Sequence, residues 1–414
     1  MSTKTITTNY LAFIFDDLTE FYATRELIDK LKRKKIPTDI IIPFDSGYNG
    51  LAKHTYTKIK DLGYNPLNDV PKNKIYKVLL TPYPELDIIQ RTNFIYHIRM
   101  PYSTISAKPN PTYNIASKIN YDAIICFNNY EPAFLNCYGA ECYSVPYWKY
   151  SNFKKKPSKN QKPTLLILPT FGQDTSCVQY LSDTMINDIK KHFKVIIKAH
   201  HAIHFGQDGQ DALKKLRDFA DEFYDSDTPI TELLKTADIV LSDNSGSIFE
   251  SIYANTPIVA FSKDLNARSL NGIDTLQYQL MQDNILPYTN DPSKILPLLL
   301  SAKTYFKKQQ NIKKKLFPET KTNSVDVTVN ILKQYLNKDN TKDYRKILHD
   351  MMLEEWFKNK KDSQENPKLK AQISTLEAKV KQYEAVFDSG AYQFYDKLIA
   401  PYKKIKTMRN KHEK

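Results

Sequence analysis

The sequence has 414 residues, of which 41% are hydrophobic, 12% aromatic and 26% charged. This composition excludes a disordered or fibrous chain, and the length exceeds what one hydrophobic core usually serves, so we expect two domains. The formal net charge of +14 suits nucleic acid, anionic lipid or phosphorylated substrates. No RRM, KH or helix-turn-helix signature accompanies the lysine-rich runs, and we therefore expect no nucleic-acid partner.

The first residues and the cysteines indicate a reducing compartment. The N-terminal apolar segment is too short for a signal peptide and meets Asp16 and Asp17, and no run of eighteen apolar residues follows, so a cytoplasmic chain is expected. The cysteines form no CxxC pair, which favours buried thiols over zinc ligands or disulfides: Cys126, Cys137, Cys142 and Cys177.

Strand-like and helix-like segments alternate through the first half. Apolar runs at 10–17, 38–44, 74–83, 92–100 and 121–129 predict strands, and the amphipathic stretch 19–35 predicts a helix. This alternation is typical of a parallel α/β sheet.

A Pro- and Lys-rich connector then precedes a second alternating half. Strands are predicted at 164–171, 194–200, 238–243 and 256–262, and helices at 178–193, 211–223, 228–237 and 247–255. We therefore predict two facing Rossmann-like domains, at 1–150 and 164–335, joined by a linker at 151–163. The cleft between them is the expected active site.

Residues 336–414 are predicted to form a helical tail. Apolar residues from Leu369 to Phe387 follow a short heptad pattern, which would allow a homo-oligomer through a coiled coil. Aromatic residues and lysines alternate over 391–414, a pattern that suits a helix lying on an anionic membrane surface. Docking of this helix on the protein's own surface is the alternative.

The segment 237–261 carries the main candidate site. A strand ends in small polar residues that precede a helix, so free backbone N–H groups would face an incoming phosphate. Ser247 and Glu250 also match a capping box, which explains part of the pattern without a ligand. The residues predicted to bind the donor here are Asp243, Asn244, Ser245, Gly246, Ser247 and Glu250.

A second group of polar residues ends the strand at 194–200. Lys198 and His200 lie there, and His201 and His204 follow closely. A histidine at this edge would act as a hydrogen-bond donor or acid toward a pyrophosphate, and a zinc site is an alternative that lacks a supporting motif.

These motifs resemble the C-terminal half of the CDP-glycerol glycerophosphotransferase family of teichoic acid and capsule synthesis. The matching positions are Pro169, Thr170, His200, Leu233, Leu234, Asp238, Asp243, Ser245, Phe249, Glu250, Pro257 and Asp264. Asn244 and Gly246 depart from the family's DYSS motif, and His201 replaces its usual proline. In the first half "HIRMPYS" stands where the family has "HGTPLK" and keeps only His97 and a nearby Pro101.

The resemblance implies a GT-B fold and an enzyme that moves a polyol phosphate from a CDP-activated donor. The acceptor would be a hydroxyl of a lipid-linked saccharide or growing polymer, which places the enzyme on the inner face of the membrane. His97 is expected as general base, and His200 with the loop amides as stabilisers of the leaving group. Thr170 and Lys198 would bind the donor, and Asp243 and Glu250 would orient the loop.

Two alternatives remain open: a GT-B glycosyltransferase that uses a UDP-sugar, and a non-catalytic scaffold of the same pathway. No DxD motif stands at a strand end, so we expect no bound metal or other cofactor, although metal dependence is open. The polyol, the acceptor and the number of additions are also open.

Overall fold

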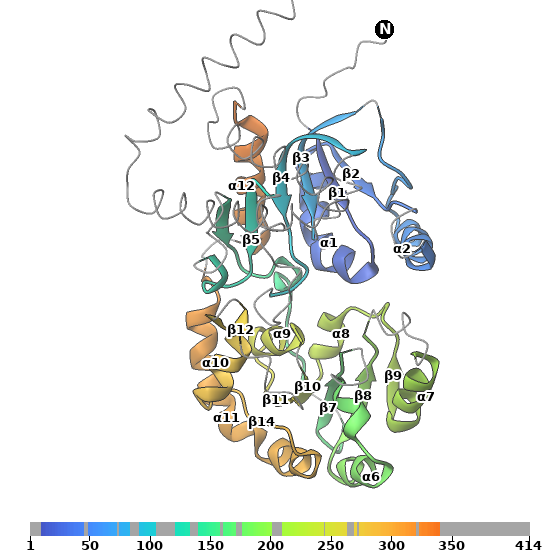
Figure 1. Ribbon diagram of the computed structural model, residues 1–414, viewed down its shortest axis with the longest axis vertical. Coiled ribbons are helices and arrows are strands. Elements are labelled where there is room, and N and C mark those ends of the chain that lie inside the picture. The colour runs from blue at the N-terminus through green and yellow to red at the C-terminus, as the bar shows by residue number, and fades with distance from the viewer. Residues whose placement is uncertain are drawn as a thin grey trace, which may run out of the picture.

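The computed structural model describes residues 10–44, 49–72, 74–82, 91–104, 121–132, 140–157, 160–170, 176–200, 209–243, 245–262, 269–270, 273–319 and 323–339. Two α/β units lie one above the other in Figure 1, with the N-terminal half in the upper unit. The predicted coiled coil and basic helix lie outside the described residues.

The first unit contains a parallel sheet of six strands in the order β2-β1-β3-β4-β5-β6. Its strands are β1 (Leu11–Ile14), β2 (Thr38–Ile41), β3 (Ile75–Thr81), β4 (Asn93–Arg99), β5 (Ala123–Cys126) and β6 (Glu141–Ser144). Five of these six strands were predicted, and β6 was missed because it is short and only partly buried. Both sides of strands such as β1 and β5 are buried, as in sheets covered on both faces.

Helix α1 (Leu18–Arg33) shows how the sequence sets a helix boundary. Asp17 accepts a hydrogen bond from the Glu20 amide, and Glu20 accepts one in return from the Asp17 amide, which completes a capping box. Its apolar face, including Phe21 and Leu27, is fully buried, and basic residues occupy its last turn, where they complement the helix dipole. Helix α2 (Asn49–Asp61), which was not predicted, packs beside it.

The second unit repeats this architecture with the strand order β14-β11-β10-β7-β8-β9, again parallel. Its strands are β7 (Thr164–Leu168), β8 (Lys194–Lys198), β9 (Glu222–Tyr224), β10 (Ile239–Ser242), β11 (Ile258–Phe261) and β14 (Tyr288–Thr289), and β12 (Ser269–Leu270) and β13 (Ile273–Asp274) form a small hairpin. The four predicted strands of this half are present. Residues 222–223, predicted as the end of a helix, instead begin β9.

Helices cover both faces of the second sheet (Figure 1). They are α6 (Asp183–His192), α7 (Gly209–Phe219), α8 (Ile230–Leu234), α9 (Ser247–Tyr253), α10 (Leu276–Gln282) and α11 (Ile295–Leu316), with single turns η4 (Cys177–Tyr180) and η6 (Pro292–Lys294). The single turn η3 (Trp148–Tyr150) packs against α1 of the first unit. Helix α12 (Ser324–Asn337) returns to the first unit, where it contacts α1 and β3. Lys30 of α1 and Asp326 of α12 form an ion pair at 2.9 Å. The sequence grouped residues 324–335 with the second half, whereas these contacts join them to the first.

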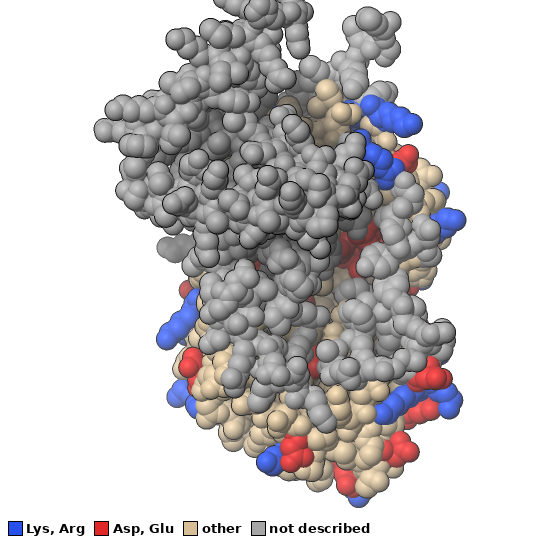
Figure 2. All heavy atoms as spheres, in the orientation of Figure 1, with Lys and Arg blue, Asp and Glu red and all other residues tan. Residues whose placement is uncertain are grey.

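Lysines and acidic residues are mixed over the visible surface of the second unit (Figure 2). Several form local pairs, such as Lys191 with Asp188 and Lys214 with Asp218. Among the described residues, none of the helices combines the length and hydrophobicity needed to span a bilayer.

The linker is anchored to the second unit by Lys155. Its ammonium donates hydrogen bonds to the Leu234 carbonyl at 2.9 Å and to the Thr256 hydroxyl at 2.6 Å, and it also contacts the Ala237 carbonyl. Burial lowers the pKa of Lys155 to about 8, although nearby Asp238 favours the charged form. The connector is therefore fixed to the second unit by the ammonium of one lysine.

This lowered pKa makes a prediction about stability and pH. Between the folded pKa of about 8 and the ordinary value of 10.5, the unfolded chain binds more protons than the folded one, so stability gains a contribution as pH rises. We expect the urea midpoint of the wild type to rise relative to Lys155→Met from pH 8 to pH 10. A constant difference between the two proteins over this range would contradict the assignment.

Candidate functional site

The predicted donor-binding residues meet at one edge of the second sheet. Strands β8, β7 and β10 are neighbours and parallel, so their carboxyl ends lie side by side. Thr170 follows β7, Lys198 and His200 end or follow β8, and the loop 243–247 follows β10. This is the edge at which parallel α/β sheets bind ligands. Asn244, His201 and His204 lie outside the described residues.

Asp243 joins two parts of this edge and does not face solvent. Its carboxylate accepts hydrogen bonds from the Thr170 amide at 2.9 and 3.1 Å and from the Cys177 amide at 3.0 Å. The side chain is fully buried. Asp243 thus fixes the segment after β7 against the loop after β10, and its part in donor binding stays a prediction.

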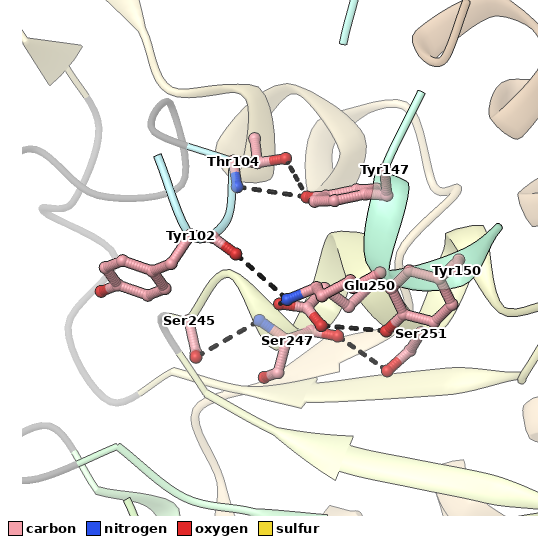
Figure 3. Close-up of polar contacts among 9 residues, drawn as sticks. Tyr102, Thr104, Tyr147, Tyr150, Ser245, Ser247, Glu250 and Ser251 are labelled. Atoms are coloured by element: carbon pink, nitrogen blue, oxygen red, sulfur yellow. Dashed lines mark hydrogen bonds and ion pairs between the residues drawn. The ribbon is translucent and has the colours of Figure 1, made fainter. Parts of the chain in front are cut away.

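Serine hydroxyls in and beside the loop form hydrogen bonds with one another and with the backbone. The Ser247 hydroxyl lies 2.7 Å from that of Ser242, which in turn donates to the Leu168 carbonyl at 2.8 Å. The predicted capping box is wrong, because the N-cap of α9 is Gly246 and has no side-chain hydrogen bond. Ser245 and Ser247 instead lie on one side of a tight turn, and the Ser247 amide donates to the Ser245 hydroxyl at 3.4 Å (Figure 3).

Glu250 is held by η3, the turn that precedes the linker. One carboxylate oxygen pairs with the Lys149 ammonium at 2.9 Å, and the other accepts a hydrogen bond from the Tyr150 hydroxyl at 2.9 Å. The Lys149 and Glu250 side chains are only 8% and 6% exposed, so both charges are buried together. Burial and the Glu250 charge raise the pKa of Tyr150 well above its usual range. Lys149 was not predicted from the sequence. Its sequence signal is that it is the one cation among the aromatic residues of 147–150.

The charge of Lys198 is influenced by groups from both units. Burial lowers its pKa to about 8, whereas Asp17, Glu250 and Asp227 favour the ammonium, and Lys149 opposes it. Asp17 comes from the first unit, and the other acidic residues come from the second. Lys198 therefore lies within electrostatic reach of both units, as expected of a group that binds an anion between them.

The first unit touches the donor loop directly. A Cβ placed on Gly246 would lie 2.3 Å from the Ser103 hydroxyl oxygen and 2.9 Å from its Cβ, so only glycine fits at this contact. The segment 101–104 follows β4 and is held by Tyr147, whose hydroxyl accepts a hydrogen bond from the Thr104 amide at 3.1 Å. Figure 3 shows Tyr102 and Thr104 on one side of this junction and Ser245, Ser247 and Glu250 on the other.

His97 does not lie at this edge. It belongs to β4 before the strand ends and is fully buried, with Nε2 2.8 Å from the Thr81 hydroxyl oxygen and its ring against Tyr121 at 4.4 Å. A buried ring in the sheet cannot contact a substrate without a rearrangement. The general-base role stays a prediction, and the observed surroundings are those of a packing residue.

Substitution of His97 separates these two roles. We expect His97→Ala to lose about 2–4 kcal/mol of stability, because a buried aromatic ring and its hydrogen bond are removed. His97→Gln retains a partner for Thr81 and should cost less. Thermal unfolding and activity per folded molecule are the measurements. A loss of 10²-fold or more in kcat with unchanged stability would instead support the base role.

His200 remains a candidate for phosphate contact. It is partly exposed and lies two residues beyond β8, the strand that ends at Lys198. Within the described ranges, no group of three His, Cys, Asp or Glu side chains is arranged to hold a metal ion. Of the cysteines in these ranges, Cys126 and Cys177 are buried free thiols and Cys142 is half-buried.

Comparison with known structures shows which fold this is. The wall teichoic acid polymerase TagF aligns with a TM-score of 0.53 and 13% identity, over 80% of this chain and 89% of that one. A protein from Listeria monocytogenes assigned as a UDP-N-acetylglucosamine 2-epimerase gives 0.53 and 8% over 82% and 100%. MnaA from S. aureus, solved with UDP, gives 0.52 and 10% over 80% and 97%. These similarities confirm the predicted α/β, GT-B-like fold.

The second unit also carries a match to a known protein family. Residues 153–281 match the family described as CDP-Glycerol:Poly(glycerophosphate) glycerophosphotransferase, and this segment contains Thr170, Lys198, His200 and the loop 243–250. No curated protein sequence matches the chain. In this segment the chain is similar to that family, as its motifs predicted, and the similarity identifies it as an enzyme of the transferase type.

Proposed function

We propose that this enzyme transfers glycerol phosphate, or a closely related polyol phosphate, from a CDP-activated donor to a hydroxyl of a lipid-linked saccharide or growing surface polymer. The observation that carries the proposal is the convergence of Lys198, His200 and the Ser245–Ser247 turn at one sheet edge inside the matched segment. Positive charge and small residues gathered there suit a diphosphate.

The reaction forms one P–O bond and breaks another. The acceptor oxygen attacks the phosphorus that carries the polyol, and the bond from that phosphorus to the oxygen bridging to CMP breaks. CMP leaves with the bridging oxygen and its electron pair, and the acceptor's proton passes to a base or to solvent. The enzyme's main task is to hold the reacting atoms in line and to stabilise charge on the departing phosphate.

The residues take distinct parts in this proposal. Lys198 neutralises the diphosphate, and His200 and the loop amides stabilise the bridging oxygen as it gains charge. Asp243 positions the Thr170 segment, and Glu250 fixes the first turn of α9 rather than binding a ribose, because both its oxygens are already engaged. His97 is the base that the sequence predicts, and the variants described above test it.

The location and further partners are also proposals. We infer a cytoplasmic enzyme that lies on the inner face of the membrane through the basic segment 391–414, and a homo-oligomer through the heptads of 369–387. Aromatic and lysine residues at helical spacing support the first inference. Deletion of residues 366–414 should abolish binding to anionic vesicles; unchanged binding would refute the membrane role.

Nucleotide release tests the proposed reaction. Purified enzyme with a crude bacterial lipid or polymer acceptor is offered CDP-glycerol, CDP-ribitol and a set of UDP-sugars, and products are separated chromatographically. We expect CMP from a CDP-polyol and no UDP. Release of UDP from a UDP-sugar would move the enzyme to the GT-B glycosyltransferases, and no release from any donor would favour a scaffold.

A further inference from the structure

The contacts of Lys149 point to a role that the proposed reaction does not assign. This lysine lies in η3, between the last strand of the first unit and the linker. Its ammonium pairs with Glu250 at 2.9 Å and donates a hydrogen bond to the Tyr102 carbonyl at 3.0 Å. One buried cation thus joins the helix that follows the donor loop to the segment that follows β4.

The surrounding groups hold the Lys149 ammonium in one position. It is 8% exposed, and the Tyr147 and Tyr150 rings lie 5.6 and 6.0 Å from it. The Tyr150 hydroxyl holds the second oxygen of Glu250, so the carboxylate cannot turn away to another partner without losing that bond. The ion pair is therefore held in one geometry, and removal of one partner would leave the other charge buried without compensation.

The Lys149 contacts bear on the distance between Gly246 and Ser103. Glu250 lies one helical turn beyond Gly246, and Tyr102 immediately precedes Ser103, so the Lys149 contacts set how closely these two residues approach. The donor loop belongs to the second unit and Ser103 to the first. Their distance controls where an acceptor bound by the first unit meets a phosphate bound by the second.

We propose that Lys149 is a positioning residue, which holds the donor loop and the acceptor-side segment 101–104 in register for transfer. The proposal rests on the proposed function, because it presumes that the donor phosphate binds at the loop. Lys149 does not contact the substrate in this account. It acts through Glu250 on one side and through the Tyr102 backbone on the other.

The variants are Lys149→Met, which removes the charge, and Lys149→Arg, which can keep both contacts. We expect Lys149→Met to lower kcat about 30-fold or more while CDP affinity, measured by calorimetry, changes less than about 3-fold, because misalignment of bound groups reduces turnover. Lys149→Arg should restore kcat to within about 5-fold of the wild type.

Lys155→Met is the matched control. Lys155 is a nearby lysine whose ammonium also makes several hydrogen bonds, but these contact only the second unit. It should alter stability without a comparable fall in kcat. Equal losses of kcat in the methionine and arginine variants of Lys149, together with lost CDP binding, would overturn the proposal in favour of a purely structural lysine. An unchanged kcat in Lys149→Met would also overturn it.

Small-angle X-ray scattering of the full-length chain gives a readout that does not depend on the reaction. We expect Lys149→Met, but not Lys149→Arg, to increase the radius of gyration relative to the wild type, because the two units lose a shared contact. Identical curves would contradict the proposal. If the wild type releases no CMP from CDP-glycerol, the proposed reaction fails, and scattering alone decides the role of Lys149.

Discussion

Lys198→Met is expected to reduce kcat/KM for the CDP-activated donor by about 10²-fold, because the cation that neutralises the donor diphosphate is lost. Most of the loss should be in donor KM, since the diphosphate is charged before as well as during the reaction. Lys194→Met is the control: it changes the same residue type at the opposite end of β8, where the lysine pairs with Glu222. This variant should retain activity.

The pH profile of the wild type tests the same residue. Below pH 8 the Lys198 side chain is an ammonium, and above that value it becomes a neutral amine, because burial lowers its pKa to about 8. In the free enzyme kcat/KM should therefore fall as pH rises through 8. Lys198→Arg should lose this descending limb, because a guanidinium stays charged up to about pH 12. A limb that persists unchanged in the arginine variant would assign it to another group.

The elements of the second unit could be predicted because their sequence signals are local. Alternating apolar runs gave β7, β8, β10 and β11, and small residues between β10 and α9 marked the ligand edge. The parallel order of the strands then brings Thr170, Lys198 and the loop together without further information. Short or half-exposed elements such as β6 and β9 carry too few apolar residues for such a prediction.

The contacts between the two units could not be predicted from the sequence. Nothing local shows that Lys149 meets Glu250, because the pair joins residues about a hundred positions apart and is created by domain packing. The burial of His97 could not be predicted for a related reason. Its position near a motif-like segment suggested a cleft residue, but the alternation of side chains along β4 directs it into the interior beside Thr81.

Gly246→Ala is expected to have the second large effect on activity. The backbone of Gly246 has a φ of −58°, which any residue adopts, so the substitution causes no backbone strain. The new Cβ would instead lie 2.3 Å from the Ser103 hydroxyl oxygen and 2.9 Å from the Ser103 Cβ. Ser103 is buried and its segment is held by Tyr147 and Lys149, so the first unit must shift away from the loop. We expect kcat to fall about 10²-fold, since an ångström of misplacement is enough for such a loss.

The contact with Ser103 predicts which second substitution should restore activity to Gly246→Ala. Ser103→Gly removes both atoms that an alanine at 246 would meet, whereas Ser103→Ala leaves the Cβ at 2.9 Å. In the Gly246→Ala background, Ser103→Gly should therefore recover most of the lost kcat, and Ser103→Ala should recover little. Steady-state kinetics of the wild type, the three single variants and the two double variants gives the coupling between the two positions. If both suppressors act equally, the Ser103 hydroxyl alone is responsible for the loss of kcat. If neither acts, the two units do not meet at Gly246 during catalysis, and the loop's requirement for glycine must come from the donor itself.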